Sequence, residues 1–241
     1  MTHDYPKTAL ITGAARRVGK AMALRLAEHG FDIALHYNHS SDAALLTKKE
    51  IEKKGRHCHL FQADLLKDEE LEKLMPTVLE QMPGLCLLVN NASLWKEGNF
   101  IDSTKEELDL YLRIHVEVPY LLTKDFAKLA RKGLVVNMID SNIVKHSSRY
   151  FAYLLSKKAL YDFTLLAATE LAPEIRVNAI APGAVQAADD RRKGEEESKP
   201  KQNQLNRQGS AEDVADALEF LINSEHVSGQ CIFVSGGKHL S

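Results

Sequence analysis

Short runs of strand-forming residues alternate with longer segments of helical periodicity along the whole chain. The helical segments, such as residues 18–29 and 108–130, are too long and too unbroken to be strands. Because strands that alternate with helices form a parallel sheet covered on both faces, the alternation predicts an α/β fold with a doubly wound parallel sheet. The expected strands are residues 8–12, 31–37, 57–63, 85–90, 133–139, 175–180 and 231–234.

The length of 241 residues fits one large domain, so we expect a single Rossmann-like domain with a seven-stranded parallel sheet over residues 1–241. The 44% share of hydrophobic residues excludes a disordered chain. The net charge of −2 argues against a nucleic-acid partner but leaves room for a local basic pocket. Without a signal sequence or an apolar run that could span a bilayer, the chain is expected to be cytoplasmic, with no membrane partner. Cys58, Cys86 and Cys231 lack metal-ligand spacing, so we expect buried thiols and no metal site.

Residues 186–208 form the one stretch without a continuous apolar face, and they are rich in charge. The stretch is too long for an ordinary connection in a compact domain. It follows the sixth expected strand at the edge where doubly wound sheets bind ligands. We therefore expect either a solvated surface excursion or a mobile substrate loop that acts as a lid.

The first expected strand runs into a turn of small residues, Thr12 to Gly19, and a helix opens directly after it. Such a turn lets backbone N–H groups approach a phosphate, and the helix N-terminus adds about half a positive charge. After the second strand, residues 35–41 lack the carboxylate that an NAD-specific domain usually offers to the ribose hydroxyls. Donors to a 2′-phosphate are present instead, which favours NADP over NAD. These donors are Arg17, Asn38, His39 and Ser40, although Ser40 is also a candidate helix N-cap and His39 a candidate solvated loop residue.

Tyr153 and Lys157 lie four positions apart at the start of a helical segment, so both side chains are expected on one helix face. An ammonium beside a phenol favours the phenolate, so we expect the pKa of Tyr153 to be lowered. This would make Tyr153 a usable acid near neutral pH. The alternative is an exposed pair of side chains on a surface helix.

In this order, the motifs resemble those of the short-chain dehydrogenase/reductase family. The first turn is similar to the family's TGxxxGxG turn, with Arg17 in place of the middle glycine. Further matches follow the third, fourth and sixth strands: Asp64 for the family's adenine-binding acid, Asn90-Asn91-Ala92-Ser93 for its Asn-Asn-Ala-Gly, and Asn178, Pro182 and Gly183 for the segment whose backbone faces the nicotinamide.

The family usually has a serine thirteen positions before the catalytic tyrosine, and this chain has Asp140 there, followed by Ser141. A carboxylate that faces a carbonyl oxygen gaining negative charge would repel it. The same group helps a ring imine nitrogen that must gain a proton, provided that the carboxyl group carries one. Asp140 therefore favours C=N reduction over C=O reduction, whereas a role for Ser141 would need a one-residue slip between the strand and Tyr153.

This combination resembles the pteridine reductase branch of the family, including the bacterial dihydromonapterin reductases. The turn with Arg17 matches the branch's TGxxxRxG turn, and residues 35–40 match its cofactor loop. Trp95, the only tryptophan, stands where the branch has an aromatic that sandwiches the pterin against the nicotinamide; a core or interface tryptophan is the alternative. His115 aligns with the asparagine of the family's catalytic tetrad, either as a core histidine or as part of a water relay behind Lys157.

The resemblance implies NADPH as cofactor, a pterin-like small-molecule substrate and a homotetramer. The implied catalytic residues are Asp140, Tyr153 and Lys157. The implied cofactor-binding residues are Gly13, Arg16, Arg17, Val18, Gly19, Asn38, His39, Ser40, Asp64, Asn91, Ala92, Ser93, Tyr153, Lys157, Pro182 and Gly183. The implied substrate-binding residues are Arg17, Ser93, Trp95, Asp140 and Tyr153.

Three functions remain open from the sequence. The first is an NADPH-dependent reductase that transfers hydride to the C=N bond of a dihydropterin or dihydrofolate. The second is a carbonyl reductase, such as a 3-oxoacyl-acyl carrier protein reductase, that uses Ser141. The third is an NADP-binding sensor without catalysis, because a fold does not fix a function.

Overall fold

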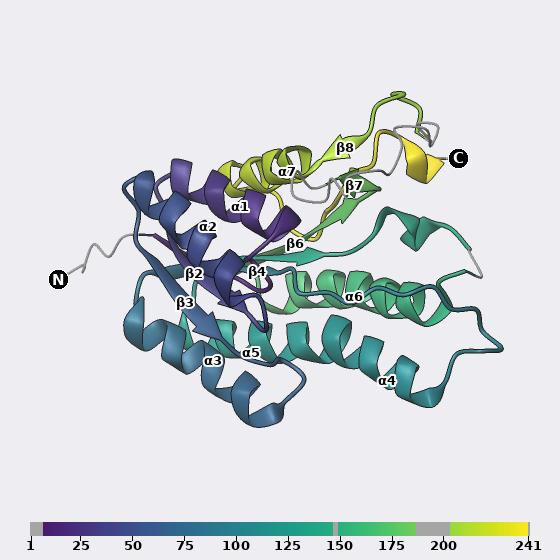
Figure 1. The fold of residues 1–241 in the computed structure, drawn as a ribbon, viewed down its shortest axis with the longest axis horizontal. Coiled ribbons are helices and arrows are strands. Elements are labelled where there is room, and N and C mark those ends of the chain that lie inside the picture. Colours follow the sequence, from purple (N-terminus) through teal and green to yellow (C-terminus); the bar gives the residue numbers. More distant parts are fainter. Residues whose placement is uncertain (1–6, 147–148, 187–202, 241) are drawn as a thin grey trace.

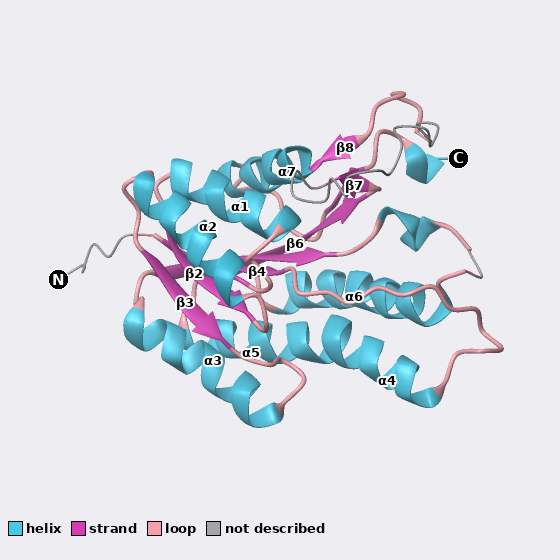
Figure 2. Cartoon of the chain, in the orientation of Figure 1, coloured by secondary structure: helices cyan, strands magenta, loops and turns pink. Residues whose placement is uncertain are grey.

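A seven-stranded sheet with the order β3-β2-β1-β4-β5-β6-β9 forms the centre of the molecule (Figures 1 and 2). The structure is a computed structural model that describes residues 7–146, 149–186 and 203–240. All neighbouring strands in this sheet are parallel, which confirms the expected Rossmann-like α/β fold. The strands are β1 (Thr8–Ile11), β2 (Asp32–Tyr37), β3 (Cys58–Gln62), β4 (Leu85–Asn90), β5 (Gly133–Met138), β6 (Ile175–Pro182) and β9 (Cys231–Val234).

Helices cover both faces of the sheet (Figure 1). One apolar cluster joins one face to α1 (Arg17–Glu28), α2 (Ser41–Lys53) and α7 (Ala211–Asn223). A second cluster joins the other face to α3 (Asp68–Gln81), α5 (Val118–Leu129) and α6 (Phe151–Glu170). In α1 the buried positions are 19, 22, 23, 26 and 27, the spacing of one helix face. The chain order changes direction between β1 and β4, and in such sheets this switch point marks the ligand-binding edge.

The expected helix over residues 108–130 is interrupted by a wider turn. It consists of α4 (Lys105–Leu112), the π-helical segment η1 (Arg113–Glu117) and α5. Pro119 lies near the start of α5 and has no backbone N–H to bond the carbonyl of His115, four residues earlier. The π-helical turn relieves the clash that the proline ring would make with that carbonyl in a regular α-helix.

A buried polar chain fixes α6 against the sheet. The Asn90 amide on β4 donates to the Asn137 Oδ1 atom on β5 at 2.8 Å, and the Asn137 amide donates to the Thr164 hydroxyl on α6 at 2.9 Å. The Thr164 hydroxyl in turn donates to the carbonyl of Leu160 at 2.8 Å. Asn137 and Thr164 are fully buried. Because α6 also carries Tyr153 and Lys157, these hydrogen bonds set the position of both side chains relative to the strand ends.

Replacing Thr164 with valine is expected to lower the free energy of unfolding by about 1–3 kcal/mol, because the buried Asn137 amide then loses its acceptor. The matched control is Thr169→Val on the same helix. The Thr169 hydroxyl also bonds back to a carbonyl one turn earlier, that of Leu165, but the residue is exposed. We expect the control to change the free energy by less than about 0.5 kcal/mol. Urea unfolding measures both, and equal effects would show that the buried chain is not what stabilises α6.

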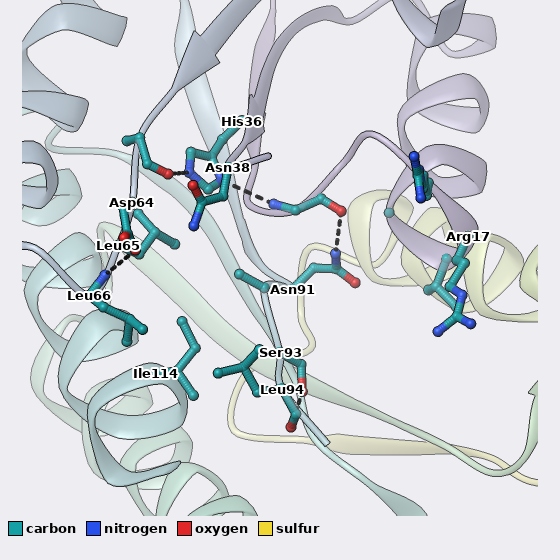
Figure 3. Close-up of a pocket in the computed structure, with 16 residues that line it drawn as sticks. Arg17, His36, Asn38, Asp64, Leu65, Leu66, Asn91, Ser93, Leu94 and Ile114 are labelled. Atoms are coloured by element: carbon teal, nitrogen blue, oxygen red, sulfur yellow. Dashed lines mark hydrogen bonds between the residues drawn. The ribbon is translucent and has the colours of Figure 1, made fainter. Parts of the chain in front are cut away.

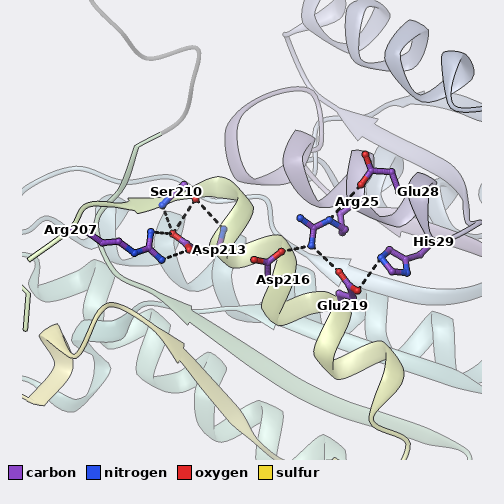
Figure 4. Close-up of polar contacts among 8 residues, drawn as sticks. All are labelled: Arg25, Glu28, His29, Arg207, Ser210, Asp213, Asp216 and Glu219. Carbon is purple, nitrogen blue, oxygen red and sulfur yellow. Dashed lines mark hydrogen bonds and ion pairs between the residues drawn. The ribbon is translucent and has the colours of Figure 1, made fainter. Parts of the chain in front are cut away.

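Ion pairs hold α7 against α1 (Figure 4). Arg25 on α1 contacts Asp216 and lies 2.8 Å from Glu219, both on α7. At the start of α7, the carboxylate of Asp213 accepts from Ser210 and from Arg207, and Arg207 lowers its pKa to about 2. These contacts fix the chain where it enters α7.

The ends of the expected loop at residues 186–208 are paired with each other. The strands β7 (Val185–Gln186) and β8 (Gly209–Ser210) form a short parallel ladder, which the sequence pattern did not predict. The hypothesis of a lid falls mainly on residues 187–202, which lie outside the described residues.

The burial of the three cysteines differs from one to the next. Cys58 is buried as expected, and burial raises the pKa of its thiol to about 12. Cys86 and Cys231 are only partly buried, so the expectation of full burial is wrong for these two.

Across the part of the chain that the structure describes, no helix has both the length and the apolar character needed to cross a bilayer.

Candidate active site

A cavity of about 400 Å³ opens at the carboxyl ends of β1, β2, β3 and β4 (Figure 3). It lies at the switch point of the sheet, as the fold predicts. It brings together ten of the expected cofactor residues: Gly13, Arg16, Arg17, Val18, Gly19, Asn38, Asp64, Asn91, Ala92 and Ser93. Six lining residues were not singled out as site residues from the sequence: His36, Ala63, Leu65, Leu66, Leu94 and Ile114.

The first turn packs tightly against the turn after β4. The Thr12 hydroxyl accepts from the backbone N–H groups of Asn91 and Ala92 at 2.9 Å, and the Asn91 amide donates to the Thr12 carbonyl at 2.8 Å. A Cβ atom at Gly19 would lie 2.5 Å from the Gly13 carbonyl oxygen, and Gly13 itself has φ +65°. Only glycine fits both positions, so the backbone of this turn is held open toward the cavity.

His36 links three strand ends at the bottom of the cavity. Its Nδ1 atom accepts from the backbone N–H of Gly13 at 3.1 Å, and its Nε2 atom donates to the Ala63 carbonyl at 3.0 Å. Burial lowers the pKa of His36 to about 4, so the ring is neutral and each nitrogen has one role. The Gly13 N–H is therefore engaged by a side chain, and the phosphate donors of the turn must come from other groups. The sequence signal that could have identified this link is a histidine within the mostly apolar expected strand at residues 31–37.

The basic side of the cavity is the start of α1. Arg17, its first residue, has φ +52°, a left-handed conformation that costs a non-glycine residue about 1–2 kcal/mol. An arginine is thus kept where a glycine would be less strained. On the β2 side, His39 is exposed, and neither it nor Ser40 lines the cavity. Ser40 occupies the N-cap position of α2 without a side-chain cap bond, so only the positional part of that alternative is confirmed.

The tyrosine at the start of α6 faces the aspartate after β5. The Tyr153 hydroxyl donates to the Asp140 Oδ2 atom at 2.9 Å. The Oδ1 atom of Asp140 accepts from the backbone N–H and the side-chain amide of Asn142, at 2.7 and 2.9 Å. Ser141 is buried, and its hydroxyl has no partner among the described residues. The expected register holds, so Asp140 and not Ser141 faces the tyrosine.

The lysine one turn further along α6 does not activate the phenol in the way the sequence suggested. Lys157 is buried and donates to the carbonyl of Met138 at 2.8 Å. Burial lowers its pKa to about 8. The expected lowering of the Tyr153 pKa is wrong for this structure, because burial and the nearby Asp140 carboxylate raise that pKa. Tyr153 therefore keeps its proton, and its hydroxyl donates to Asp140.

Trp95 and His115, two further residues that the sequence singled out, lie in different environments. Trp95 is 60% exposed, and its ring lies 5.4 Å from that of Tyr150, so the alternative of a core tryptophan is wrong. His115 is buried and hydrogen-bonded to Ser93 and to Ser156 at 2.8 Å each. It is thus a core histidine, and both of its ring nitrogens are engaged by serine hydroxyls.

Pro182 and Gly183 lie at the carboxyl end of β6 and do not line the cavity. The backbone N–H of Gly183 donates to the carbonyl of Val234 at 2.9 Å, so the segment is fixed by β9. Tyr153 lines a separate small cleft together with Tyr111 and Tyr150. None of the three expected catalytic residues, Asp140, Tyr153 and Lys157, lines the larger cavity.

These residues fit a phosphorylated dinucleotide. The turn admits only glycine at two positions, and Arg16 and Arg17 line the cavity. Asp64, the residue expected to bind adenine, also lines it. The Asp64 Oδ1 atom accepts from the backbone N–H of Leu66 at 3.1 Å, which orients the carboxylate. Among the described residues, no cluster of histidine, cysteine or acidic side chains could hold a metal ion.

Comparison with known proteins points to one family. A family model described as enoyl-(acyl carrier protein) reductase matches residues 13–239. A 3-oxoacyl-(acyl-carrier-protein) reductase of Staphylococcus epidermidis is 30% identical over 252 residues, covering 97% of this chain and 99% of the relative. A short-chain dehydrogenase/reductase of Armillaria gallica is 33% identical, covering 96% of this chain and 95% of the relative.

Similarity to pterin and folate reductases is also present. A dihydromonapterin reductase of Enterobacter sp. (strain 638) is 29% identical, covering 96% of each chain. The crystal structure of an alternative dihydrofolate reductase 1, FolM, from Brucella suis in complex with NADP has a TM-score of 0.89 and 34% sequence identity. It covers 98% of this chain and 96% of that chain.

Proposed function

The chain belongs to the short-chain dehydrogenase/reductase family, and on that premise we propose that it is an NADPH-dependent reductase that reduces a C=N bond of a dihydropterin or dihydrofolate. The observation that carries the proposal is the hydrogen bond of 2.9 Å between the Tyr153 hydroxyl and the Asp140 carboxylate. The dihydromonapterin reductase and the dihydrofolate reductase among the similar proteins support it.

The carboxylate discriminates between the two reductions. Reduction of a carbonyl builds negative charge on oxygen, and a carboxylate beside the proton donor opposes that charge. Reduction of an imine instead leaves a nitrogen that takes up a proton, and a carboxyl group beside it can supply or relay that proton. Asp140 is only partly buried, so it can exchange protons with solvent.

The roles of the side chains follow from these contacts. When bound, the cofactor supplies the hydride that is added to the ring carbon. Tyr153 gives its proton to the ring nitrogen, and Asp140 returns a proton to the phenol from solvent. Lys157 places a positive charge in the buried site behind the phenol, and it is proposed to hold the ribose of the cofactor. Carbon gains the hydride and nitrogen gains the proton, so the C=N bond becomes CH–NH.

A carbonyl reductase is the second candidate, because a 3-oxoacyl-(acyl-carrier-protein) reductase is equally similar to this chain. The feature that favours it is the buried hydroxyl of Ser141 next to Asp140, which has no partner among the residues that the structure describes. An NADP-binding sensor is the third candidate, and the contact between Tyr153 and Asp140 weighs against it.

The direct test is the oxidation of NADPH by the purified protein. We expect faster oxidation when dihydrobiopterin, dihydromonapterin or dihydrofolate is added, together with formation of the tetrahydro product. Oxidation no faster with all three than without them would contradict the proposal. Calorimetric binding of NADPH without turnover of any pterin or carbonyl substrate would support the sensor.

The preference for NADPH over NADH is proposed to depend on Arg17. Replacing Arg17 with glycine, which tolerates the positive φ, is expected to raise the KM for NADPH by about 10–100-fold, because a charge-assisted bond of roughly 1.5–3 kcal/mol is lost. The KM for NADH is expected to stay nearly unchanged. The matched control is Arg131→Gly, since Arg131 also has a positive φ, +64°, but does not line the cavity. Equal losses for the two cofactors would contradict a role in binding the 2′-phosphate.

The homotetramer implied by the family resemblance stays a prediction. A shallow depression lined by α4, η1, Tyr120 of α5 and Phe163 of α6 offers a face for a second copy, and α6 also carries the 72% exposed side chain of Leu166. Light scattering that gives the mass of one chain would contradict it.

A further inference from the structure

His115 connects the ligand cavity to the helix that carries the catalytic tyrosine. Its Nε2 atom lies 2.8 Å from the hydroxyl of Ser93, which lines the cavity. Its Nδ1 atom lies 2.8 Å from the hydroxyl of Ser156, which sits between Tyr153 and Lys157 on α6. The ring belongs to the π-helical segment η1, where helices often carry functional groups.

The direction of these hydrogen bonds follows from the number of protons available. The Ser156 hydroxyl is 2.7 Å from the backbone carbonyl of Tyr153, and because a carbonyl only accepts, Ser156 must donate its single proton there. The oxygen of Ser156 can therefore only accept from His115. It follows that the Nδ1 atom of His115 carries a proton.

The other side of the ring is then determined as well. Burial and the nearby Lys157 ammonium lower the pKa of His115 to about 2, so the ring is neutral and carries one proton. That proton is on Nδ1, which leaves Nε2 as an acceptor. The Ser93 hydroxyl must therefore donate to Nε2.

One competing bond exists for Ser93, and it is weaker. The Ser93 hydroxyl is also 3.4 Å from the backbone carbonyl of Leu94. That distance is longer than the 2.8 Å to His115. Donation to Leu94 would also leave a buried ring nitrogen without a donor, at a cost of about 1–3 kcal/mol. Ser93 is exposed, so its remaining lone pairs are open to a ligand.

We propose that His115 is a positioning residue that fixes the Ser93 hydroxyl as a hydrogen-bond acceptor toward the ligand, so that this part of the cavity selects a ligand that presents an N–H donor. The inference rests on the proposed function for the identity of that ligand, whose aminopyrimidine edge carries such donors. A ligand that presents a carbonyl or an ether oxygen at this point meets only lone pairs. The family asparagine at position 115 would be shorter than histidine and could not hold both serines.

The first test is substrate discrimination by a matched pair of variants. In His115→Asn the shorter side chain places its amide where Nδ1 lies in histidine, so the Ser93 hydroxyl has no acceptor and is free to rotate. In His115→Gln the longer side chain places its amide oxygen where Nε2 lies, so the acceptor for Ser93 is kept.

The measured quantity is the ratio of kcat/KM for a dihydropterin with its 2-amino group to that for the same dihydropterin lacking it. We expect a ratio of about ten in the unmodified protein and in His115→Gln. In His115→Asn and in Ser93→Ala we expect a ratio near one, with the change mainly in KM. An unchanged ratio in His115→Asn would overturn the proposal.

The second test needs no substrate, and it uses a variant only to assign the signals. Nitrogen-15 chemical shifts of the His115 ring, assigned by comparison with His115→Gln, report which nitrogen carries the proton. We expect a protonated Nδ1 and an unprotonated Nε2 that do not titrate between about pH 5 and 8. A proton on Nε2 would overturn the proposal. If the unmodified protein turns over no dihydropterin, the proposed function fails, and the direction of the Ser93 hydroxyl is then decided by this measurement alone.

Discussion

Replacing Tyr153 with phenylalanine is expected to lower kcat for dihydropterin reduction by about 10²–10⁴-fold, the usual contribution of a positioned proton donor. The hydroxyl is the only part removed, and with it the 2.9 Å bond to Asp140. The ring remains packed edge-on against His115 and Tyr111, so the fold is expected to persist. Single-turnover measurement of NADPH oxidation gives the chemical step, and calorimetry shows whether NADPH still binds.

Tyr150→Phe is the matched control for this variant. Tyr150 precedes α6, and its hydroxyl donates to Glu97 at 3.0 Å instead of to Asp140. We expect it to reduce kcat far less than Tyr153→Phe does. Equal kcat values for Tyr153→Phe and the unmodified protein would show that the proton comes from another group.

The change Asp140→Asn has opposite expected effects on the two candidate reactions. It keeps an oxygen that accepts from Tyr153, but it removes the group that can carry a proton. For a dihydropterin we therefore expect kcat/KM to fall by about 10²–10⁴-fold. For a 3-oxoacyl thioester, removal of a negative charge near the developing oxyanion is expected to raise kcat/KM. Steady-state rates of NADPH oxidation with each substrate measure both effects.

The exposed Asp102 serves as a matched control, because its carboxylate also accepts a hydrogen bond from the side-chain amide of a neighbouring asparagine, Asn99. Asp102→Asn is expected to leave both rates unchanged. A dihydropterin rate in Asp140→Asn equal to that of the unmodified protein would remove Asp140 from the proton path, whatever the carbonyl rate becomes.

Most of the fold could be predicted from the sequence because it depends on periodicity. The runs at residues 8–12 and 85–90 form the central strands β1 and β4. The small-residue turn that follows β1 forms part of the cavity wall. The family resemblance placed Asp140 and Tyr153 in one site, and the structure shows them in contact. Local pattern was sufficient for the strands and the turn, because the carboxyl ends of parallel strands meet at one edge of the sheet.

Features that depend on three-dimensional packing could not be predicted in this way. The sign of the Tyr153 pKa shift depends on the burial of the phenol and on its contact with the Asp140 carboxylate, and both arise from tertiary packing. No periodic pattern in the sequence marks the π-helical turn at His115. The same holds for the ladder between β7 and β8, which pairs two segments that are distant in the sequence. His36 is the intermediate case: a polar residue in a buried strand was visible, but its two partners are far away in sequence.

The central claim is that the pair of Tyr153 and Asp140 serves reduction of a pterin C=N bond. The most direct measurement compares kcat/KM of the unmodified protein for a dihydropterin and for a 3-oxoacyl thioester, with NADPH as the common cofactor. The account predicts that the dihydropterin is the better substrate. Turnover of the 3-oxoacyl thioester with no measurable turnover of dihydrobiopterin, dihydromonapterin or dihydrofolate would contradict it.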